Sequence, residues 1–209
     1  MRKTFLLIAM SALLVAGCSG DKGAGAAKAG GSLKGAGAVA LDGKEVSIAG
    51  VTVKAPGVWK DFGPSGMRAA SYAYGPVKGD ADSATVAVFY FGKQGGGAIE
   101  ANFDRWLGQM EMTGGGDPRT AAKRADGTAD GMPFHHMEVA GAYNGAAMGG
   151  GMGGMGGMGS GARPGYFMSA AVLEAPEGSL FFKLTGPEKT AREMNDAFLA
   201  MLQAARKAK

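Results

Sequence analysis

Four methionines lie close together in a run of glycine, at Met148, Met152, Met155 and Met158. Thioether sulfur is a soft ligand that favours Cu(I), and glycine lets the chain bend so that several sulfurs meet at one ion. Ordering such a segment costs conformational entropy, and the run holds no histidine or cysteine to anchor the ion. We therefore expect a surface loop without a binding role; the alternatives are a Cu(I) or Ag(I) site and an apolar tip that contacts a partner or a membrane.

A second candidate is the glycine-rich segment GKQGGG at residues 92–97, which lies between a predicted strand and a predicted helix. Backbone amides at the start of a helix can hold an anion, which makes Lys93, Gly95 and Gly96 candidate anion-binding residues. The segment lacks the G-K-[ST] sequence that a phosphate-binding loop places at the start of its helix. A plain glycine-rich connection is therefore the preferred interpretation.

Residues suited to catalysis do not converge in the sequence. The two histidines, His135 and His136, are adjacent on a predicted strand, so their side chains point to opposite faces and cannot form one proton relay. Neither G-x-S-x-G nor H-E-x-x-H occurs. Four aspartates fall in turn-rich segments, where solvated turn residues are expected: Asp80, Asp82, Asp126 and Asp130. We predict a binding protein rather than an enzyme, with no cofactor.

The beginning of the chain resembles the signal peptide of a bacterial lipoprotein. Arg2 and Lys3 precede a short apolar run, and the small residues of Val15-Ala16-Gly17 stand directly before Cys18, the single cysteine. The resemblance implies cleavage after residue 17, attachment of diacylglycerol to the Cys18 thiol and acylation of the new amino terminus by a fatty acid such as palmitate. Several acyl chains on one residue anchor a protein firmly to a membrane.

The composition is that of an exported protein with one domain. Residues 18–43 form a predicted Gly/Ala/Lys tether behind the lipidated cysteine, and residues 44–209 form one domain with a disordered Met/Gly loop at 145–164. Ser19 stands where aspartate is typical of inner-membrane retention, so we expect the periplasmic face of the outer membrane. The formal net charge of +4 is small and the basic residues form no long run, which argues against nucleic-acid binding.

Hydrophobic patterning predicts an antiparallel sheet with two amphipathic helices. The predicted strands are 46–53 (one bent strand or two short ones), 66–74, 83–92, 119–124, 134–143, 165–175 and 179–187, with helices at 95–112 and from Pro187 onward. The strand at 83–92 is apolar on both faces, which places it in the centre of the sheet. We expect an α+β domain of order β-β-β-α-β-β-β-β-α, in which the helices cover both faces of the sheet.

Three segments, APGVWKDFGPSGMRAASY, VAVFYFGKQGGGAIEANFDRW and PGYFMSAAVLEAPEGSLFFKLTGPEKT, resemble an uncharacterised family of bacterial lipoproteins. The order of the elements is similar to the PsbP-like (Mog/PsbP-type) α/β/α sandwich. This resemblance implies the fold and no activity, because one fold serves many functions. The expected function is a lipid-anchored protein of the cell envelope that binds an envelope protein or a small ligand; the alternative is a Cu(I)-handling lipoprotein that uses the methionine-rich loop.

Overall fold

The computed structural model describes residues 39–145 and 161–208. Its centre is an eight-stranded sheet in which β3, β4, β5, β10, β9, β8 and β6 follow one another and β7 pairs with β8. All of these pairs are antiparallel. The strands are β3 Lys60–Asp61, β4 Arg68–Tyr74, β5 Ala84–Tyr90, β6 Met110–Glu111, β7 Lys123–Ala129, β8 Met132–Tyr143, β9 Arg163–Leu173 and β10 Leu180–Pro187.

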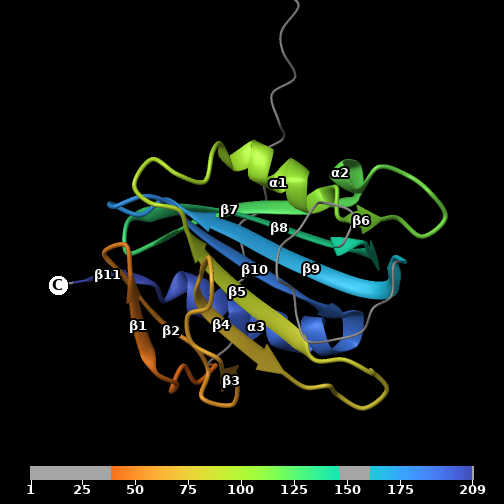
Figure 1. Cartoon of the computed structure of the whole chain (residues 1–209), viewed down its shortest axis with the longest axis horizontal. Helices are drawn as coiled ribbons and strands as arrows, with labels where there is room; N and C mark the ends of the chain where they lie inside the picture. Colours follow the sequence, from red (N-terminus) through yellow and green to blue (C-terminus); the bar gives the residue numbers. More distant parts are fainter. Residues whose placement is uncertain (1–38, 146–160, 209) are drawn as a thin grey trace, which may run out of the picture.

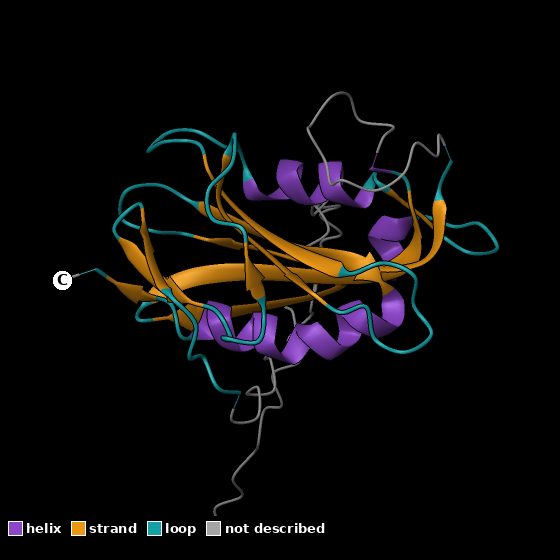
Figure 2. Ribbon diagram, turned by 60° about the horizontal axis from the view of Figure 1, so that its bottom comes forward, coloured by secondary structure: helices purple, strands orange, loops and turns teal. Residues whose placement is uncertain are grey.

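Helices cover both faces of this sheet (Figure 2). On one face, α3 (Glu188–Gln203) packs Met194 and Phe198 against the strands. On the other face, α1 (Ile99–Leu107) packs Phe103 and Trp106 over residues of β8, β9 and β10. The short helix α2 (Pro118–Ala121) lies beside α1 (Figure 1). The predicted α+β sandwich with two amphipathic helices is confirmed.

A second, three-stranded sheet joins the two ends of the described chain. The strands β1 (Glu45–Ile48) and β2 (Val51–Lys54) form a tight hairpin, and β11 (Arg206–Lys207) pairs with β2. Positive φ angles of 51° at Ala49 and 71° at Gly50 suit the turn between β1 and β2. The segment at 46–53 is thus two short strands, and the two-residue strand β11 was not predicted.

Most predicted strands differ from the structure by one or two residues at an end, and two predicted elements differ by more. The strand predicted at 119–124 is wrong in its first half, because residues 118–121 form α2 and β7 begins at Lys123. The Asp117 side chain accepts a hydrogen bond from the Arg119 amide at 2.9 Å and Pro118 opens the helix, which is a typical helix start. The helix predicted at 95–112 spans only Ile99–Leu107, since Gly108 ends it and Met110 enters β6.

Within the described residues, no helix has the length and apolar character needed to cross a bilayer.

Candidate functional site

Lys183 lies in the middle of β10, on the sheet face that α1 covers, between Ala87 of β5 and Ala170 of β9. The two alanines leave room for its long side chain. Its Nζ donates hydrogen bonds to Gln109 Oε1 and, at 3.3 Å, to the Tyr143 hydroxyl, and it stands 5.1 Å from the centre of the Tyr143 ring. Two segments far from β10 in the sequence therefore hold this ammonium group in position.

Positive charge gathers around Lys183. Burial, together with the charges of Arg105 and Arg68, lowers the pKa of Lys183 to about 8. Within the part of the chain that the structure describes, no carboxylate forms an ion pair with Lys183 or Arg105. We call Lys183, Tyr143, Gln109, Arg68 and Arg105 the Lys183 cluster. A half-buried ammonium without a counter-ion opposes folding, because burial removes its hydration and like charges repel it.

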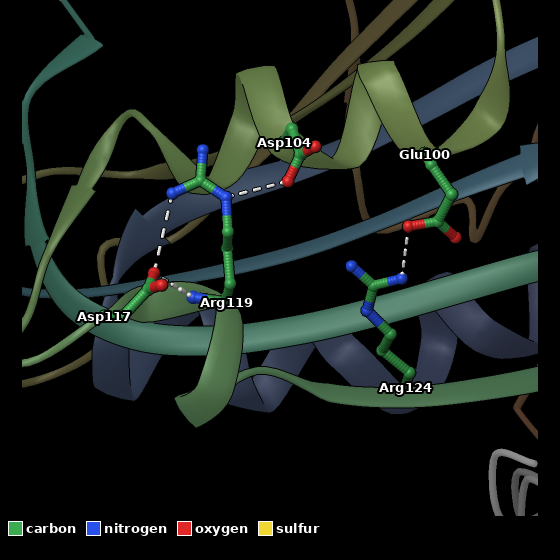
Figure 3. A network of polar contacts seen from close by, with 5 residues as sticks. All are labelled: Glu100, Asp104, Asp117, Arg119 and Arg124. Carbon is green, nitrogen blue, oxygen red and sulfur yellow. Dashed lines mark hydrogen bonds and ion pairs between the residues drawn. The ribbon is translucent and has the colours of Figure 1, made fainter. Parts of the chain in front are cut away.

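The acidic side chains of α1 are engaged elsewhere, as Figure 3 shows. Asp104 accepts a hydrogen bond from Arg119 Nε at 2.8 Å, and Glu100 accepts one from Arg124 Nη1 at 2.6 Å. Arg119 also lies 3.5 Å from Asp117. Each exposed ion pair adds little stability alone. Together they join α1 to α2 and β7, and they keep both carboxylates of α1 away from Arg105.

A pair of stacked tyrosines borders the Lys183 cluster. The rings of Tyr143 and Tyr166 are nearly parallel, with centres 5.7 Å apart. The Tyr166 hydroxyl donates to Asp82 at 3.1 Å and accepts from Arg163 at 3.2 Å, and Arg163 lies 3.7 Å from Asp82. Burial raises the pKa of Tyr143, although Arg163 and Arg68 act against this rise. Tyr143 is therefore a neutral hydrogen-bonding group at neutral pH.

We expect the substitution Lys183→Met to stabilise the folded protein at pH 7. Below pH 8 the folded chain carries the buried charge, whereas the unfolded chain keeps the ordinary pKa of 10.5, so the charged lysine opposes folding. After allowance for the hydrogen bonds lost, the gain is about 1–2 kcal/mol. Urea unfolding from pH 7 to 10.5 checks this, because the gain shrinks as pH rises above 8. A less stable variant at pH 7 would contradict the argument.

The two histidines point to opposite faces of the sheet, as predicted. His136 is buried on the α3 face, where its Nε2 lies 2.8 Å from Ser169 Oγ, and burial lowers its pKa to about 4 despite the charge of Glu138. His135 lies on the α1 face between Asp126, 2.8 Å from Nδ1, and Glu174, 3.1 Å from Nε2. Burial lowers the pKa of His135, but the hydrogen bonds and charges of Glu174 and Asp126 outweigh it, and the net shift is upward.

All four aspartates predicted as solvated turn residues have hydrogen-bond partners: Asp82 accepts from the Tyr166 hydroxyl, as described above, and Asp130 accepts from the Lys207 amide at 2.8 Å. Asp126 belongs to β7 and pairs with His135 across the ladder. Asp80 accepts hydrogen bonds from the amide of Thr190 at 2.8 Å and from its hydroxyl at 2.6 Å, in the first turn of α3. The sequence KRADGTA of β7 does not alternate between apolar and polar residues, which is why most of this strand, including Asp126, was not predicted. Asp130 does lie in a turn, with a φ of 49°.

The glycine-rich segment at 92–97 borders an open hollow of about 360 Å³ beside Lys93, Gly95 and Glu174. A Cβ at Gly95 would lie 1.9 Å from the backbone oxygen of Phe91, and a Cβ at Gly96 would lie 2.3 Å from the ring of Phe181. Close packing thus requires both glycines. The Glu174 carboxylate on the wall disfavours an anion in this hollow. Anion binding by Lys93, Gly95 and Gly96 stays a prediction.

The other predicted sites lie outside the described residues. This applies to lipidation at Cys18 and to the soft-metal site at Met148, Met152, Met155 and Met158, which stay predictions. Sequence reasoning missed the Lys183 cluster. One signal was present, because Lys183 interrupts the otherwise apolar run SLFFKL of a strand buried on both faces.

Neither a protein-family model nor a curated protein sequence matches this chain. Among solved structures, the chain is similar to the cyanobacterial PsbP protein CyanoP from Synechocystis, with 12% identity, coverage of 85% of this chain and 98% of that one, and a TM-score of 0.46. It is also similar to LpqN of Mycobacterium tuberculosis, described as involved in cell envelope biogenesis, with 11% identity, 80% and 86% coverage and a TM-score of 0.43. The likeness concerns the fold alone, and no functional residue is transferred from either protein.

Proposed function

We propose that this chain is a lipid-anchored accessory protein of the bacterial cell envelope, whose domain rests on the membrane and binds a ligand there. The lipoprotein-like sequence that ends at Cys18 supports the anchor. The observation that carries the proposal is the position of the first described residues. Val39 and Ala40 line a hollow together with Val58, so the tether reaches the domain beside an exposed apolar hairpin.

This membrane-facing hairpin consists of Val58, Lys60, Phe62 and Met67, on both sides of β3. Val58 is 77% exposed, Phe62 55% and Met67 69%, the three most exposed large apolar side chains among the described residues. The first described residues and β3 lie along the same margin of the molecule in Figure 1. Exposed apolar side chains gathered in one place are typical of a contact surface.

The backbone of the membrane-facing hairpin is held in place by hydrogen bonds. The Phe62 amide donates to the Ser71 carbonyl at 2.9 Å, and the amides and carbonyls of Ser65 and Arg68 exchange hydrogen bonds of 3.0 Å. The apolar side chains are thus presented to solvent by an ordered loop. Lys60 Nζ lies 4.8 Å from the Phe62 ring, and a cation beside an aromatic ring suits the surface of an anionic bilayer.

The lipid anchor alone does not hold the domain against the membrane surface. The roughly 20 residues between Cys18 and Val39 span up to about 70 Å when fully extended, which exceeds the size of a small domain. A weak contact by the hairpin is effective under these conditions, because the tether keeps the local concentration of the bilayer high. The proposed arrangement therefore combines a strong anchor at Cys18 with a weak orienting contact.

The anchor is tested in cells by labelling with a palmitate analogue. We expect the full-length chain to take up label and to enter the membrane fraction, and Cys18→Ser to do neither. Label on the Cys18→Ser chain, or no label on either chain, rules out lipidation at Cys18.

The hairpin contact is tested separately, with purified Cys18→Ser chain and vesicles rich in phosphatidylglycerol. We expect weak binding that falls by about tenfold in Phe62→Ser/Met67→Ser, because two apolar side chains no longer enter the interface. Lys60→Glu weakens binding as well, whereas Lys123→Glu, at the opposite edge of the sheet, leaves it unchanged. Equal binding by all variants rules out the hairpin contact and leaves the anchor intact.

A further inference from the structure

We propose that the Lys183 cluster binds the phosphate group of a small molecule on the sheet face beside α1. This proposal gives a ligand class to the binding role proposed above and does not depend on the lipid anchor. It rests on three features of the described residues: the charges that act on Lys183, the N–H groups of Lys183 and Arg105 beyond those in their hydrogen bonds, and the small side chains of the sheet face beside them.

The charges around Lys183 favour a ligand with two negative charges. Arg68 of β4 and Arg105 of α1 both act on Lys183 of β10, although the three residues are far apart in the sequence. An anion beside Lys183 and Arg105 turns their mutual repulsion into attraction. A phosphate dianion suits this pair better than a single carboxylate does, because a guanidinium group can donate two hydrogen bonds to phosphate oxygens.

Lys183 and Arg105 have N–H groups beyond those that their hydrogen bonds use. A lysine ammonium has three N–H bonds, and Lys183 uses two of them, to Gln109 and Tyr143. These two contacts hold Nζ in one place, so a ligand meets a donor that is already ordered. Arg105 is likewise oriented, by a hydrogen bond from Nη2 to Asn102 Oδ1, which leaves its other donors for a ligand.

The sheet surface beside Lys183 is made of small side chains. Ser71 of β4 and Ala87 of β5 share one row with Lys183, and Thr85 and Thr185 pair in the next row on the same face. In contrast to β8, β9 and β10, the strand β4 contributes no residue to the core beneath α1 among the described residues. Short side chains thus lie beside Lys183 on the side of β4 and β5, away from the core beneath α1.

The test uses the full-length Cys18→Ser chain and three soluble probes: inorganic phosphate, glycerol 3-phosphate and acetate, followed by calorimetry or by ³¹P and ¹H NMR. We expect saturable binding of both phosphates and binding of acetate at least about tenfold weaker, since acetate has a single charge. We expect Lys183→Met and Arg105→Gln each to weaken phosphate binding by about tenfold or more. The matched control is Arg192→Gln, on the exposed side of α3. This variant should bind phosphate with the affinity of the chain that has Arg192.

A vesicle arm identifies the source of the phosphate. If phosphatidylglycerol vesicles compete with glycerol 3-phosphate, and the competition is lost in Lys183→Met, the site accepts a lipid headgroup. If glycerol 3-phosphate binds and the vesicles do not compete, the ligand is a free small molecule. Unchanged phosphate affinity in Lys183→Met, equal affinity for acetate, or no saturation by either phosphate overturns the proposal. None of these results bears on palmitate labelling of Cys18 or on vesicle binding through Phe62 and Met67.

Discussion

Acidification from pH 7 to pH 4 is expected to destabilise the folded domain by about 3 kcal/mol through His136 alone. The pKa of His136 is about 4 in the folded protein because the ring is buried, whereas the unfolded chain has the ordinary value of 6.5. Between these two pH values His136 binds a proton in the unfolded state and stays neutral in most folded molecules. Stability is therefore complete above pH 6.5 and is lost as the pH falls toward 4.

The variant His136→Gln isolates this effect, because a glutamine amide can still donate to Ser169 and does not titrate. Urea unfolding at several pH values between 7.5 and 4 should give a flatter pH profile for His136→Gln than for the unmodified chain. His135→Gln is the matched control with the opposite sign. The raised pKa of His135 gives the unmodified chain stability that is present below pH 6.5 and lost as pH rises through the pKa of the folded state. His135→Gln removes this contribution. Parallel profiles for His136→Gln and the unmodified chain would show that His136 does not carry the acid response.

The second large effect is expected from Gly96→Ala, which we predict to destabilise the domain by about 3 kcal/mol. Gly96 has a φ of 91°, and an added Cβ would lie 2.3 Å and 2.4 Å from two ring atoms of Phe181. Phe181 is buried beneath α1 and cannot turn away without disturbing Trp106, whose ring centre is 6.4 Å from its own. The substitution therefore adds steric overlap in a packed core to backbone strain.

The neighbouring substitution Gly97→Ala separates these two contributions. Gly97 also has a positive φ, of 73°, but an added Cβ there meets no atom within 4 Å. We expect a loss of about 1 kcal/mol, from backbone strain alone. Thermal and urea unfolding of both variants measures the difference. If Gly96→Ala and Gly97→Ala lose the same stability, the ring of Phe181 does not set the requirement for glycine at residue 96.

Periodic patterns of apolar residues gave the most accurate predictions of the fold. The spacing of Phe103 and Trp106 correctly placed α1 on the sheet, and strict alternation correctly placed His135 and His136 on opposite faces. Short elements have no period to detect, so α2, β3, β6 and β11 could not be predicted in this way. Their positions depend on partners far along the chain, as when β11 pairs with β2.

The candidate site was harder to predict than the fold. Lys183 was visible as a charge in an apolar strand, but Arg68, Arg105 and Gln109 are ordinary surface residue types in the sequence. Only the pairing of β4 with β5 and of β5 with β10 brings Arg68 toward Lys183. Electrostatic sites of this kind have no local motif, because they are formed by groups from several elements.

The order of strands in the main sheet also has a consequence for when the domain can fold. β5 lies at the centre of the sheet and pairs with β10, about 100 residues further along, and the two edges of the sheet are joined only through this pair. A chain that ends before residue 180 therefore has hairpins but no continuous sheet. If the first residues direct secretion, as we propose, most of the chain can enter a translocation channel before the domain is able to fold. The late position of β10 thus delays completion of the main sheet until nearly the whole chain is available.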